Sequence, residues 1–325
     1  MQVTVVIPNY NGKHFLKACL DSLAVQTSKE FQVLVVDNGS SDGSVEYMQQ
    51  EYPWVNILAL QENTGFCGGV NAGIKAADTP YVLLLNNDVE ADPGFVSSML
   101  KAIKSSKKIF SVSSKMIQFH DRSKIDDAGD LYCILGWAFQ RGVGHSVREY
   151  KTCSRVFSAC GGAAIYRRSV FEKIGYFDEM HFAYLEDIDI GYRAQIYGYK
   201  NVYCPKAVVY HVGSGTTGSK YNSFKVKLSA RNSFYLNYKN MPDWQLALNA
   251  LPLAVGYGIK WGFFRKIGFE KDYLAGLKEG FATRKKCKRV PYSREHLSHY
   301  IRIELDLIYN MFVYTIEFLS RRLSG

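Results

Sequence analysis

Between residues 81 and 89 the chain reads Tyr81-Val82-Leu83-Leu84-Leu85-Asn86-Asn87-Asp88-Val89. An uninterrupted apolar run ends here in two amides and a carboxylate. Such a run predicts a strand that is buried on both faces of a sheet. Open α/β sheets bind ligands at the carboxyl ends of their strands, and a carboxylate there can hold a hard divalent cation. A strand followed by an ordinary Asn/Asp turn has the same pattern, so the neighbouring segments must decide.

Apolar patterns on both sides of this run predict an α/β fold. Strands are expected at residues 3–7, 31–36, 55–60, 109–116, 155–167, 202–203 and 208–210. Helical spacing of apolar residues predicts helices at residues 15–23, 45–48, 69–77, 169–174 and 188–197. Because strands and helices alternate over the first hundred residues, we expect a mostly parallel sheet with helices on both faces.

The chain divides into two parts by composition. A Gly/Ser/Thr stretch at residues 213–220 predicts a loop, and the residues after it are helical, aromatic and basic in character. We therefore expect an α/β domain at residues 1–215 and a helical, basic extension at residues 216–325. The extension contains two apolar segments, residues 246–264 and 300–319, with basic residues such as Arg321 and Arg322 beside them. They can pack on the α/β domain or a second subunit in a homodimer, or lie on an anionic membrane surface, and the sequence leaves both open.

Charge and cysteine content limit the function classes. The chain has 325 residues and a net charge of +10, which suits an anionic partner such as a phosphate-bearing substrate or a membrane surface. No nucleic-acid recognition motif accompanies the charge, so nucleic acid is not expected as a partner. Seven irregularly spaced cysteines without a C-x-x-C pair argue against a disulfide framework or zinc site, and indicate a reducing cytoplasm. We find no signal peptide and no uninterrupted membrane-spanning stretch.

Three predicted strands end in similar polar residues. These ends are Pro8-Asn9-Tyr10-Asn11, Asp37-Asn38-Gly39-Ser40 and Asn86-Asn87-Asp88. Turn chemistry explains one such end more easily than three, and in a parallel sheet all three meet at one edge. Asp37 can accept a hydrogen bond from a base or a ribose hydroxyl, and Tyr10 can stack on a base. No G-x-G-x-x-G motif follows the first strand, so a Rossmann dinucleotide site is a poor fit, and a P-loop is absent as well.

Three further segments carry candidate chemistry. The loop Asn63-Thr64-Gly65-Phe66-Cys67-Gly68-Gly69-Val70-Asn71 is either a Gly-rich turn or a phosphate site at a helix that begins near Gly69. The acids of Glu186-Asp187-Ile188-Asp189 either favourably face a helix dipole or supply a general base. His211 follows a short apolar strand, where a histidine is either structural or a metal ligand.

Taken together, these motifs resemble the family-2 inverting glycosyltransferases over about residues 1–215. The matching segments, in order, are the three polar strand ends, the glycine loop and Glu186-Asp187-Ile188-Asp189. The form N-x-G-F-x-G-G-x-N in the loop resembles the bacterial rhamnosyltransferase-like branch. The resemblance implies an A-type glycosyltransferase fold and a nucleotide-sugar donor.

The resemblance also assigns expected roles to individual residues. The implied donor site consists of Pro8, Asn9, Tyr10, Asn11, Asp37, Asn38, Asn63, Gly65, Phe66, Gly68, Gly69, Asn71, Asn86, Asn87 and Asp88. Asp88 and His211 match metal ligands for Mg or Mn, whereas Asn86 departs from the family motif because an amide replaces its first acid. Asp187 matches the catalytic base. The acceptor or donor-sugar pocket matches Cys160, Gly161, Gly162 and Glu186.

The expected activity is transfer of L-rhamnose from dTDP-rhamnose to a hydroxyl of a glycan or lipid-linked acceptor, in bacterial cell-surface polysaccharide synthesis. We expect a cytoplasmic protein, peripheral at the inner face of the cell membrane. Two alternatives stay open: a family-2 transferase that uses a UDP-sugar, and a catalytically silent subunit that binds nucleotide sugar. A nucleotidyltransferase would carry a basic Gly-rich loop after its first strand, which Pro8-Asn9-Tyr10-Asn11-Gly12 is not.

Overall fold

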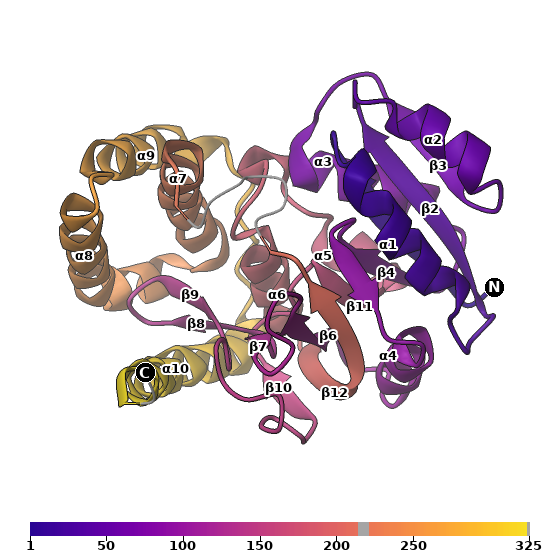
Figure 1. Cartoon of the computed structure of the whole chain (residues 1–325). Coiled ribbons are helices and arrows are strands. Elements are labelled where there is room, and N and C mark those ends of the chain that lie inside the picture. The colour runs from indigo at the N-terminus through magenta and orange to yellow at the C-terminus, as the bar shows by residue number, and fades with distance from the viewer. Residues whose placement is uncertain (214–220, 324–325) are drawn as a thin grey trace.

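The computed structural model describes residues 1–213 and 221–323, with side chains up to Ser320. The expected domain boundary at residue 215 and the side chains of Arg321 and Arg322 lie outside the described residues. Figure 1 shows a twisted sheet flanked by helices at one end of the molecule and the C-terminal helices at the other.

The described strands form one large mixed sheet and a separate hairpin. Along the sheet the order is β10-β12-β6-β11-β4-β1-β2-β3, with β5 paired to β12 and β7 paired to β6. The strands of this sheet are β1 (Val3–Asn9), β2 (Phe31–Asn38), β3 (Asn56–Leu60), β4 (Tyr81–Leu85), β5 (Val89–Ala91), β6 (Ile109–Gln118), β7 (Ile125–Asp127), β10 (Ser154–Val156), β11 (Ala163–Arg167) and β12 (Lys200–His211). The hairpin consists of β8 (Asp130–Cys133) and β9 (Trp137–Gln140).

The direction of the strands brings the candidate residues to one edge. β1 is parallel to β2 and β4, while β11 is antiparallel to both β4 and β6. β6 therefore runs in the direction of β4, and β12 is parallel to β6. As a result the carboxyl ends of β1, β2, β4, β6 and β12 lie along the same edge, where open α/β sheets bind ligands.

Helices cover both faces of the sheet. The helices of this part are α1 (Lys13–Ala24), α2 (Ser44–Glu51), α3 (Gly65–Ala76), α4 (Phe95–Lys104), α5 (Arg168–Ile174), the 3-10 turn η1 (Glu179–His181) and α6 (Glu186–Ile196). Val5 and Leu83 pack with α1, α2 and α4, whereas Val6 and Leu84 pack with α3, α5 and α6. Alternate residues of a strand point to opposite faces, so each uniformly apolar strand serves two cores. The predicted two-sided, mostly parallel sheet is confirmed.

Three expected elements differ from the structure. Residues 155–167 form β10 and β11 rather than one strand, because a turn at Cys160 to Ala163 with two glycines separates them. The expected strands 202–203 and 208–210 are parts of β12, whose pairing is irregular between Tyr203 and Val208, where Pro205 has no N–H to donate. Helix α3 begins at Gly65 instead of Gly69.

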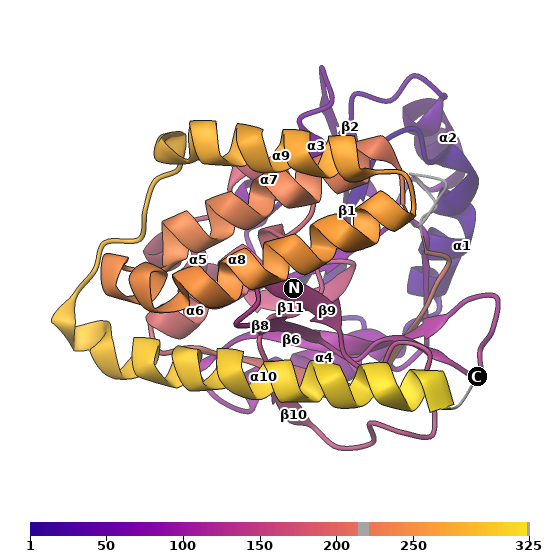
Figure 2. The same ribbon diagram turned by 90° about the vertical axis from the view of Figure 1, so that its left-hand side faces the viewer.

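The C-terminal helices pack on the sheet domain through a third core. They comprise α7 (Ser223–Asn240), α8 (Asp243–Lys266), α9 (Glu270–Thr283) and α10 (Leu297–Leu323), with 3-10 turns η2 (Arg284–Lys286) and η3 (Arg294–His296). Tyr192 of α6 and Tyr132 of β8 lie in this core with Leu236, Leu253 and Tyr300 of the C-terminal helices. Figure 2 shows these helices together on one side of the molecule. Among the described residues, no helix is long and apolar enough to span a membrane.

Candidate active site

Hydrogen bonds join the three polar strand ends. The β1–β2 register places Asn9 beside Asp37. The amide of Asn9 donates to Oδ2 of Asp37 at 3.0 Å, and its Oδ1 accepts from Nδ2 of Asn87 at 2.7 Å. All three side chains are buried. Asn9 and Asn87 thus hold the ends of β1, β2 and β4 together beneath the edge.

More exposed residues lie above this network. Tyr10 is exposed, and Asn11 adopts φ of +49° while its Oδ1 accepts from the N–H of Ser41 at 2.8 Å. Pro8 pairs in register with Val36, one residue before Asp37. The edge therefore offers an exposed aromatic ring near a buried carboxylate, an arrangement that suits a base and a ribose.

Asn38 organises the glycine loop. Its Nδ2 donates to Oδ1 of Asn63 at 3.1 Å and to the carbonyl of Gly65 at 2.9 Å, and its Oδ1 accepts from the N–H of Thr64 at 3.0 Å. Gly65 has φ of +75°, and a Cβ there would lie 2.5 Å from the ring of Phe182. The start of α3 is thereby fixed against the segment that precedes Glu186.

Other loop residues lie deeper than the sequence suggested. Gly68 and Gly69 are buried within α3, and a Cβ on Gly68 would lie 2.4 Å from the side chain of Thr64. Phe66 is half-buried. Asn71 donates to the carbonyl of Phe177 at 2.8 Å and to Glu179 at 3.0 Å, and its Oδ1 accepts from the N–H of Phe177. The side chain of Asn71 is therefore occupied in joining α3 to the loop after α5.

Asp88 and His211 lie together although 123 positions separate them in the sequence. The pairing of β5 with β12 places His211 opposite Val89, and Nε2 of His211 lies 3.5 Å from Oδ1 of Asp88. Nδ1 lies 2.8 Å from Oδ2 of Asp126. Burial disfavours the imidazolium, but the hydrogen bonds to Asp126 and Asp88 outweigh it and raise the pKa of His211 to about 10.

The geometry of this pair fits a divalent cation, whose binding would replace the proton of the imidazole because only the neutral ring is a ligand. A metal ion about 2.1 Å from each of two adjacent ligand atoms requires those atoms to be about 3 Å apart. The separation of 3.5 Å between Asp88 and His211 is close to that value. Asp126 holds the far side of the ring, as carboxylates do behind metal-bound histidines. Asn86 lies between the Asp88–His211 pair and the group around Asp187. Its N–H donates to the carbonyl of Gly162 at 2.9 Å.

The carboxyl of Asp187 is sheltered and lacks a side-chain partner on one oxygen. It lies in the first turn of α6, after three residues with positive φ, namely Phe182, Tyr184 and Leu185. Oδ1 of Asp187 is inaccessible to solvent and, in the part of the chain that the structure describes, has no hydrogen-bond partner. Burial raises the pKa of Asp187 to about 7, against a lowering by the N–H of Gly161. Burial and the charge of Asp187 likewise raise the pKa of Glu186, whose Oε2 also has no partner.

The third acid of this segment has a different environment. Asp189 is fully buried and accepts from Arg193 at 2.8 Å, Lys239 at 3.0 Å and Asn240 at 2.7 Å. Burial alone would raise the pKa of Asp189, but these partners hold that pKa far below its usual range. Asp189 therefore fixes α6 to α7, while Glu186 and Asp187 face the site.

A second acidic group lies close to Asp187. Ligand-type atoms of Asp127, Asp130 and Cys160 lie within 4.8 Å of one another. Burial raises the pKa of Asp127 to about 7 and that of the Cys160 thiol well above its usual value. A protonated thiol and carboxyls that favour protonation are poor ligands for Mg or Mn, which prefer ionised oxygens. The group offers hydrogen-bond donors and acceptors instead.

Helix α7 holds the loop that leads to Asp187. Nδ2 of the buried Asn232 lies within hydrogen-bond distance of three carbonyls, those of His181 at 2.9 Å and of Ala183 and Tyr184 at 2.8 Å. Arg231 donates to the carbonyl of Met180 at 2.9 Å. Sequence reasoning found neither Asn232 nor Asp126, because an isolated Asn in a helix or an Asp in a polar loop carries no local signal.

Comparison with protein families identifies two matching models. "Glycosyl transferase family 2" matches residues 4–175, and "Glycosyl transferase family group 2" matches residues 136–259. The chain is 30% identical over 237 residues to an N-acetylglucosaminyl-diphospho-decaprenol L-rhamnosyltransferase of Mycobacterium tuberculosis, covering 66% of this chain and 77% of that one. It is 28% identical over 180 residues to the uncharacterized glycosyltransferase YwdF of Bacillus subtilis, covering 55% and 62% respectively.

Solved structures share the fold. Staphylococcus aureus TarS 1-349 with UDP-GlcNAc has a TM-score of 0.57 and 20% identity, over 87% of this chain and 81% of that one. GalNAc-T7 with UDP, GalNAc and Mn2+ has a TM-score of 0.58 and 15% identity, over 73% and 48%. The mannosyltransferase PcManGT from Pyrobaculum calidifontis, with GDP-Man and Mn2+, has a TM-score of 0.52 and 15% identity, over 87% of both chains. The predicted A-type glycosyltransferase fold is confirmed.

Proposed function

Because this chain belongs to glycosyl transferase family 2, we propose that it transfers L-rhamnose from dTDP-rhamnose to a hydroxyl group of a lipid-linked glycan, with inversion at the anomeric carbon. The name of the mycobacterial relative supports both the sugar and the lipid-linked acceptor. The observation that carries the proposal is the sheltered carboxylate of Asp187 on the same site as the Asp88–His211 pair and Asp37.

In this proposal the donor lies along the edge of the sheet. Tyr10 and Pro8 contact the base, and Asp37 accepts from the nucleoside; its oxygens retain lone pairs beyond those used by Asn9 and the N–H of Ser40. At the N-terminus of α3 the N–H groups of Gly65 and Cys67 already donate to Oδ1 of Asn63 and to the carbonyl of Phe182, so this helix acts on the diphosphate through the positive end of its dipole.

We further propose that Asp88 and His211 hold Mg or Mn. When bound, this ion would supply positive charge that neutralises the departing diphosphate. Asp126 would orient the imidazole so that Nε2 is the coordinating atom. Since Asn86 contributes no charge, His211 takes the place of the missing acid.

Asp187 then acts as the general base. Its carboxylate removes the proton from the acceptor hydroxyl as that oxygen bonds to the anomeric carbon. The bond from that carbon to the diphosphate oxygen breaks on the opposite face, which inverts the configuration. The shelter around Asp187 keeps its pKa near the operating pH, where a general base is most effective. Glu186, Cys160, Gly161 and Gly162 line the space for the reacting sugars, together with Asp127 and Asp130.

A panel of nucleotide sugars tests this function. Purified protein is assayed for transfer from dTDP-, UDP- and GDP-linked sugars to a lipid-linked N-acetylglucosamine acceptor, with and without EDTA. The proposal expects turnover with dTDP-rhamnose that EDTA abolishes and Mn or Mg restores. Turnover with a UDP-sugar alone would show that the donor is that sugar nucleotide rather than dTDP-rhamnose. Donor binding without turnover on any acceptor would indicate a catalytically silent binding subunit. A lipid-linked acceptor would also place the protein at the cytoplasmic face of the membrane.

A further inference from the structure

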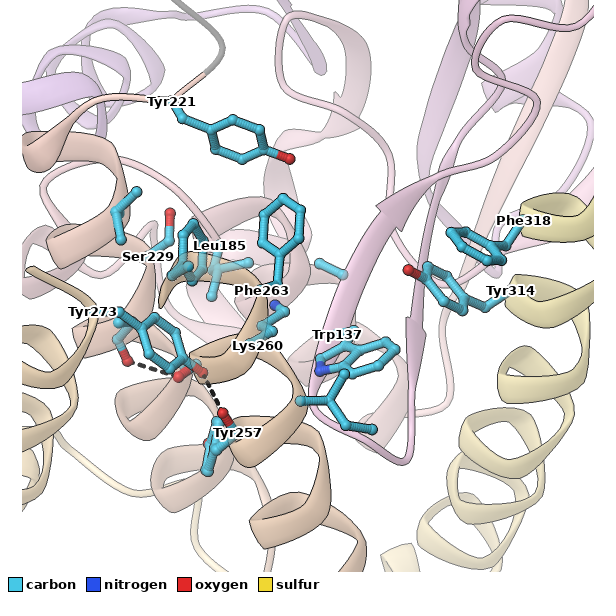
Figure 3. A pocket seen from close by; sticks show the side chains of 16 residues that line it. Trp137, Leu185, Tyr221, Ser229, Tyr257, Lys260, Phe263, Tyr273, Tyr314 and Phe318 are labelled. Carbon is cyan, nitrogen blue, oxygen red and sulfur yellow. Dashed lines mark hydrogen bonds between the residues drawn. The ribbon is translucent and has the colours of Figure 1, made fainter. Parts of the chain in front are cut away.

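A large apolar cavity lies behind the base, between the hairpin and the C-terminal helices. Its volume is about 900 Å³, within the range of sites that take whole organic ligands. Figure 3 shows Trp137 of β9, Phe263 of α8, Tyr273 of α9 and Tyr314 of α10 around it. The proposed transfer reaction uses none of these residues, and their combined surface is aromatic and aliphatic.

The cavity adjoins the proposed catalytic base. Leu185 forms part of its wall and immediately precedes Glu186 and Asp187. The donor residues Asp37 and Asp88 are absent from the lining. Glu186 and Asp187 do not line the cavity themselves, but they directly follow its wall residue Leu185, so a molecule held there lies next to the segment that carries Asp187.

A single lysine interrupts the apolar wall. Lys260 of α8 lines the cavity, and among the described residues its ammonium has no hydrogen bond or ion pair. Burial lowers the pKa of Lys260 to about 8. An ammonium in such surroundings is costly unless an anion accompanies it. The wall thus matches a ligand that combines a long apolar part with a negative group.

The cavity opens among exposed apolar side chains. Ile259 and Phe263 of α8 and Phe318 of α10 line it and are also exposed. The same two helices expose further apolar residues, including Leu251 at 74% and Ile316 at 67%. Exposed apolar surfaces of this kind mark contacts with lipid or protein. A chain could pass from a membrane into the cavity without crossing a polar surface.

We propose that this cavity binds the isoprenoid chain of the lipid-linked acceptor and that Lys260 contacts its diphosphate. The proposal rests on the function proposed above and extends it to the lipid part of the acceptor. The occupant follows from three features taken together: the apolar walls, the unpaired cation and the adjacency of Leu185 to the base. A second protein chain would match the exposed apolar faces but would leave the half-buried lysine without an anion.

Binding of short isoprenoids tests the proposal without requiring turnover. Geranylgeranyl diphosphate, geranylgeraniol and inorganic diphosphate are titrated against the full chain in calorimetry, with tryptophan fluorescence as a second signal. We expect geranylgeranyl diphosphate to bind about tenfold or more tightly than geranylgeraniol, since the contact between charged groups is lost in the alcohol. Inorganic diphosphate should not shift the fluorescence of Trp137.

Variants assign the binding to the cavity. Ser229→Phe and Ala138→Phe fill it from two walls and should each abolish isoprenoid binding, whereas Ala275→Phe on the exposed face of α9 should not. Lys260→Met should remove the preference for the diphosphate over the alcohol, and Lys266→Met, an exposed lysine of the same helix, should retain it. Unfolding midpoints establish which variants are folded. One folded cavity-filling variant is sufficient to test whether isoprenoids bind in the cavity.

Several results would overturn the proposal. These are undiminished isoprenoid binding in a folded cavity-filling variant, equal affinity for diphosphate and alcohol in the wild type, or equal competition by phosphatidylglycerol vesicles that carry no isoprenoid. Failure of the proposed function is distinguishable from these results. If no nucleotide sugar supports transfer but the isoprenoids bind as expected, the donor assignment fails and the cavity assignment stands.

Discussion

At the scale of single residues, the surroundings of Asp187 decide whether it can act as a base. Its carboxyl is sheltered, lacks a partner on Oδ1 and has a pKa raised to about 7 by burial. Asp189, two positions later, is equally acidic in the sequence but is neutralised by Arg193 and Lys239. Arg193 lies four positions after Asp189 in the same helix, but Lys239 and Asn240 belong to α7, and the sequence pattern contains no signal for contacts between these two helices.

The raised pKa predicts a pH dependence. Below about pH 7 the carboxyl of Asp187 is protonated and cannot accept a proton, so kcat should rise about tenfold per pH unit and level off above pH 7. The dependence of kcat on pH is measured from transfer rates at saturating donor and acceptor between about pH 5 and pH 9. Donor affinity, measured over the same range, is the control. A rate that stays constant down to pH 5 would show that no carboxyl with a raised pKa acts as base.

Gly161 leaves room for the carboxylate of Asp187. A Cβ at this position would lie 2.6 Å from Oδ1 of Asp187. Gly161→Ala should displace the carboxylate and lower kcat about 100-fold, since misplacement by about 1 Å can cost that much. Gly258→Ala in α8, where a Cβ meets nothing within 4 Å, should leave kcat unchanged. Equal kcat values in the two variants would show that Gly161 does not position the carboxylate of Asp187.

At the scale of elements, α7 restrains the loop that carries the base. Asn232 contacts three carbonyls between η1 and α6, in a segment with three positive φ values. Such a backbone persists only when its surroundings hold it in place. Helix α7 is therefore part of the active-site framework, although it lies beyond the segment in which motifs were found.

This arrangement predicts that Asn232→Ala impairs catalysis more than donor binding. We expect kcat to fall about tenfold or more while KM for the donor stays nearly constant, because the donor residues lie on other elements. Asn237→Ala is the matched control: this buried residue of the same helix bonds to Tyr132 and Tyr257, remote from the loop. A similar fall in kcat for both variants would indicate general destabilisation rather than positioning.

Strands and helices could be predicted from the sequence where a short stretch of residues determines them. The strand Tyr81–Leu85 is found as expected, because five apolar residues followed by amides have few alternatives. No strand was expected between residues 116 and 155, where the hairpin of β8 and β9 lies, since its strands have only four residues each and pack on α10 rather than on the sheet. α3 starts earlier than expected because Gly65 can adopt a positive φ against Phe182.

At the scale of the whole molecule, buried charges join the two parts of the chain. Lys239 of α7 lies 3.0 Å from Asp189 and 2.7 Å from Asp178. Lys239→Met should reduce the free energy of unfolding by about 3 kcal/mol, because the half-buried Asp178 loses its cation and the buried Asp189 keeps only Arg193. Urea denaturation measures this, with the exposed Lys17→Met, which breaks a surface ion pair with Asp21, as control. A change below about 1 kcal/mol, the range of surface pairs, would contradict it.

The topology of the sheet explains which parts of the site the sequence could indicate and which it could not. The convergence of Asp37, Asp88 and their neighbours was predictable, since parallel strands place their carboxyl ends at one edge. The family resemblance proposed His211 as a ligand, and its approach to Asp88 depends on β12 running parallel to β6 and on β5 pairing with it. Asp126 and Asn232 act through contacts between distant segments, for which a single sequence contains no signal.

If Asp187 removes the acceptor proton, replacing its carboxylate by an amide should slow the transfer step itself. Single-turnover transfer is measured for Asp187→Asn with donor and acceptor saturating, beside the dissociation constant of the donor. We expect transfer about 10²–10⁴-fold slower than in the wild type, with donor affinity retained. Transfer at the wild-type rate by Asp187→Asn would show that this carboxylate is not the base.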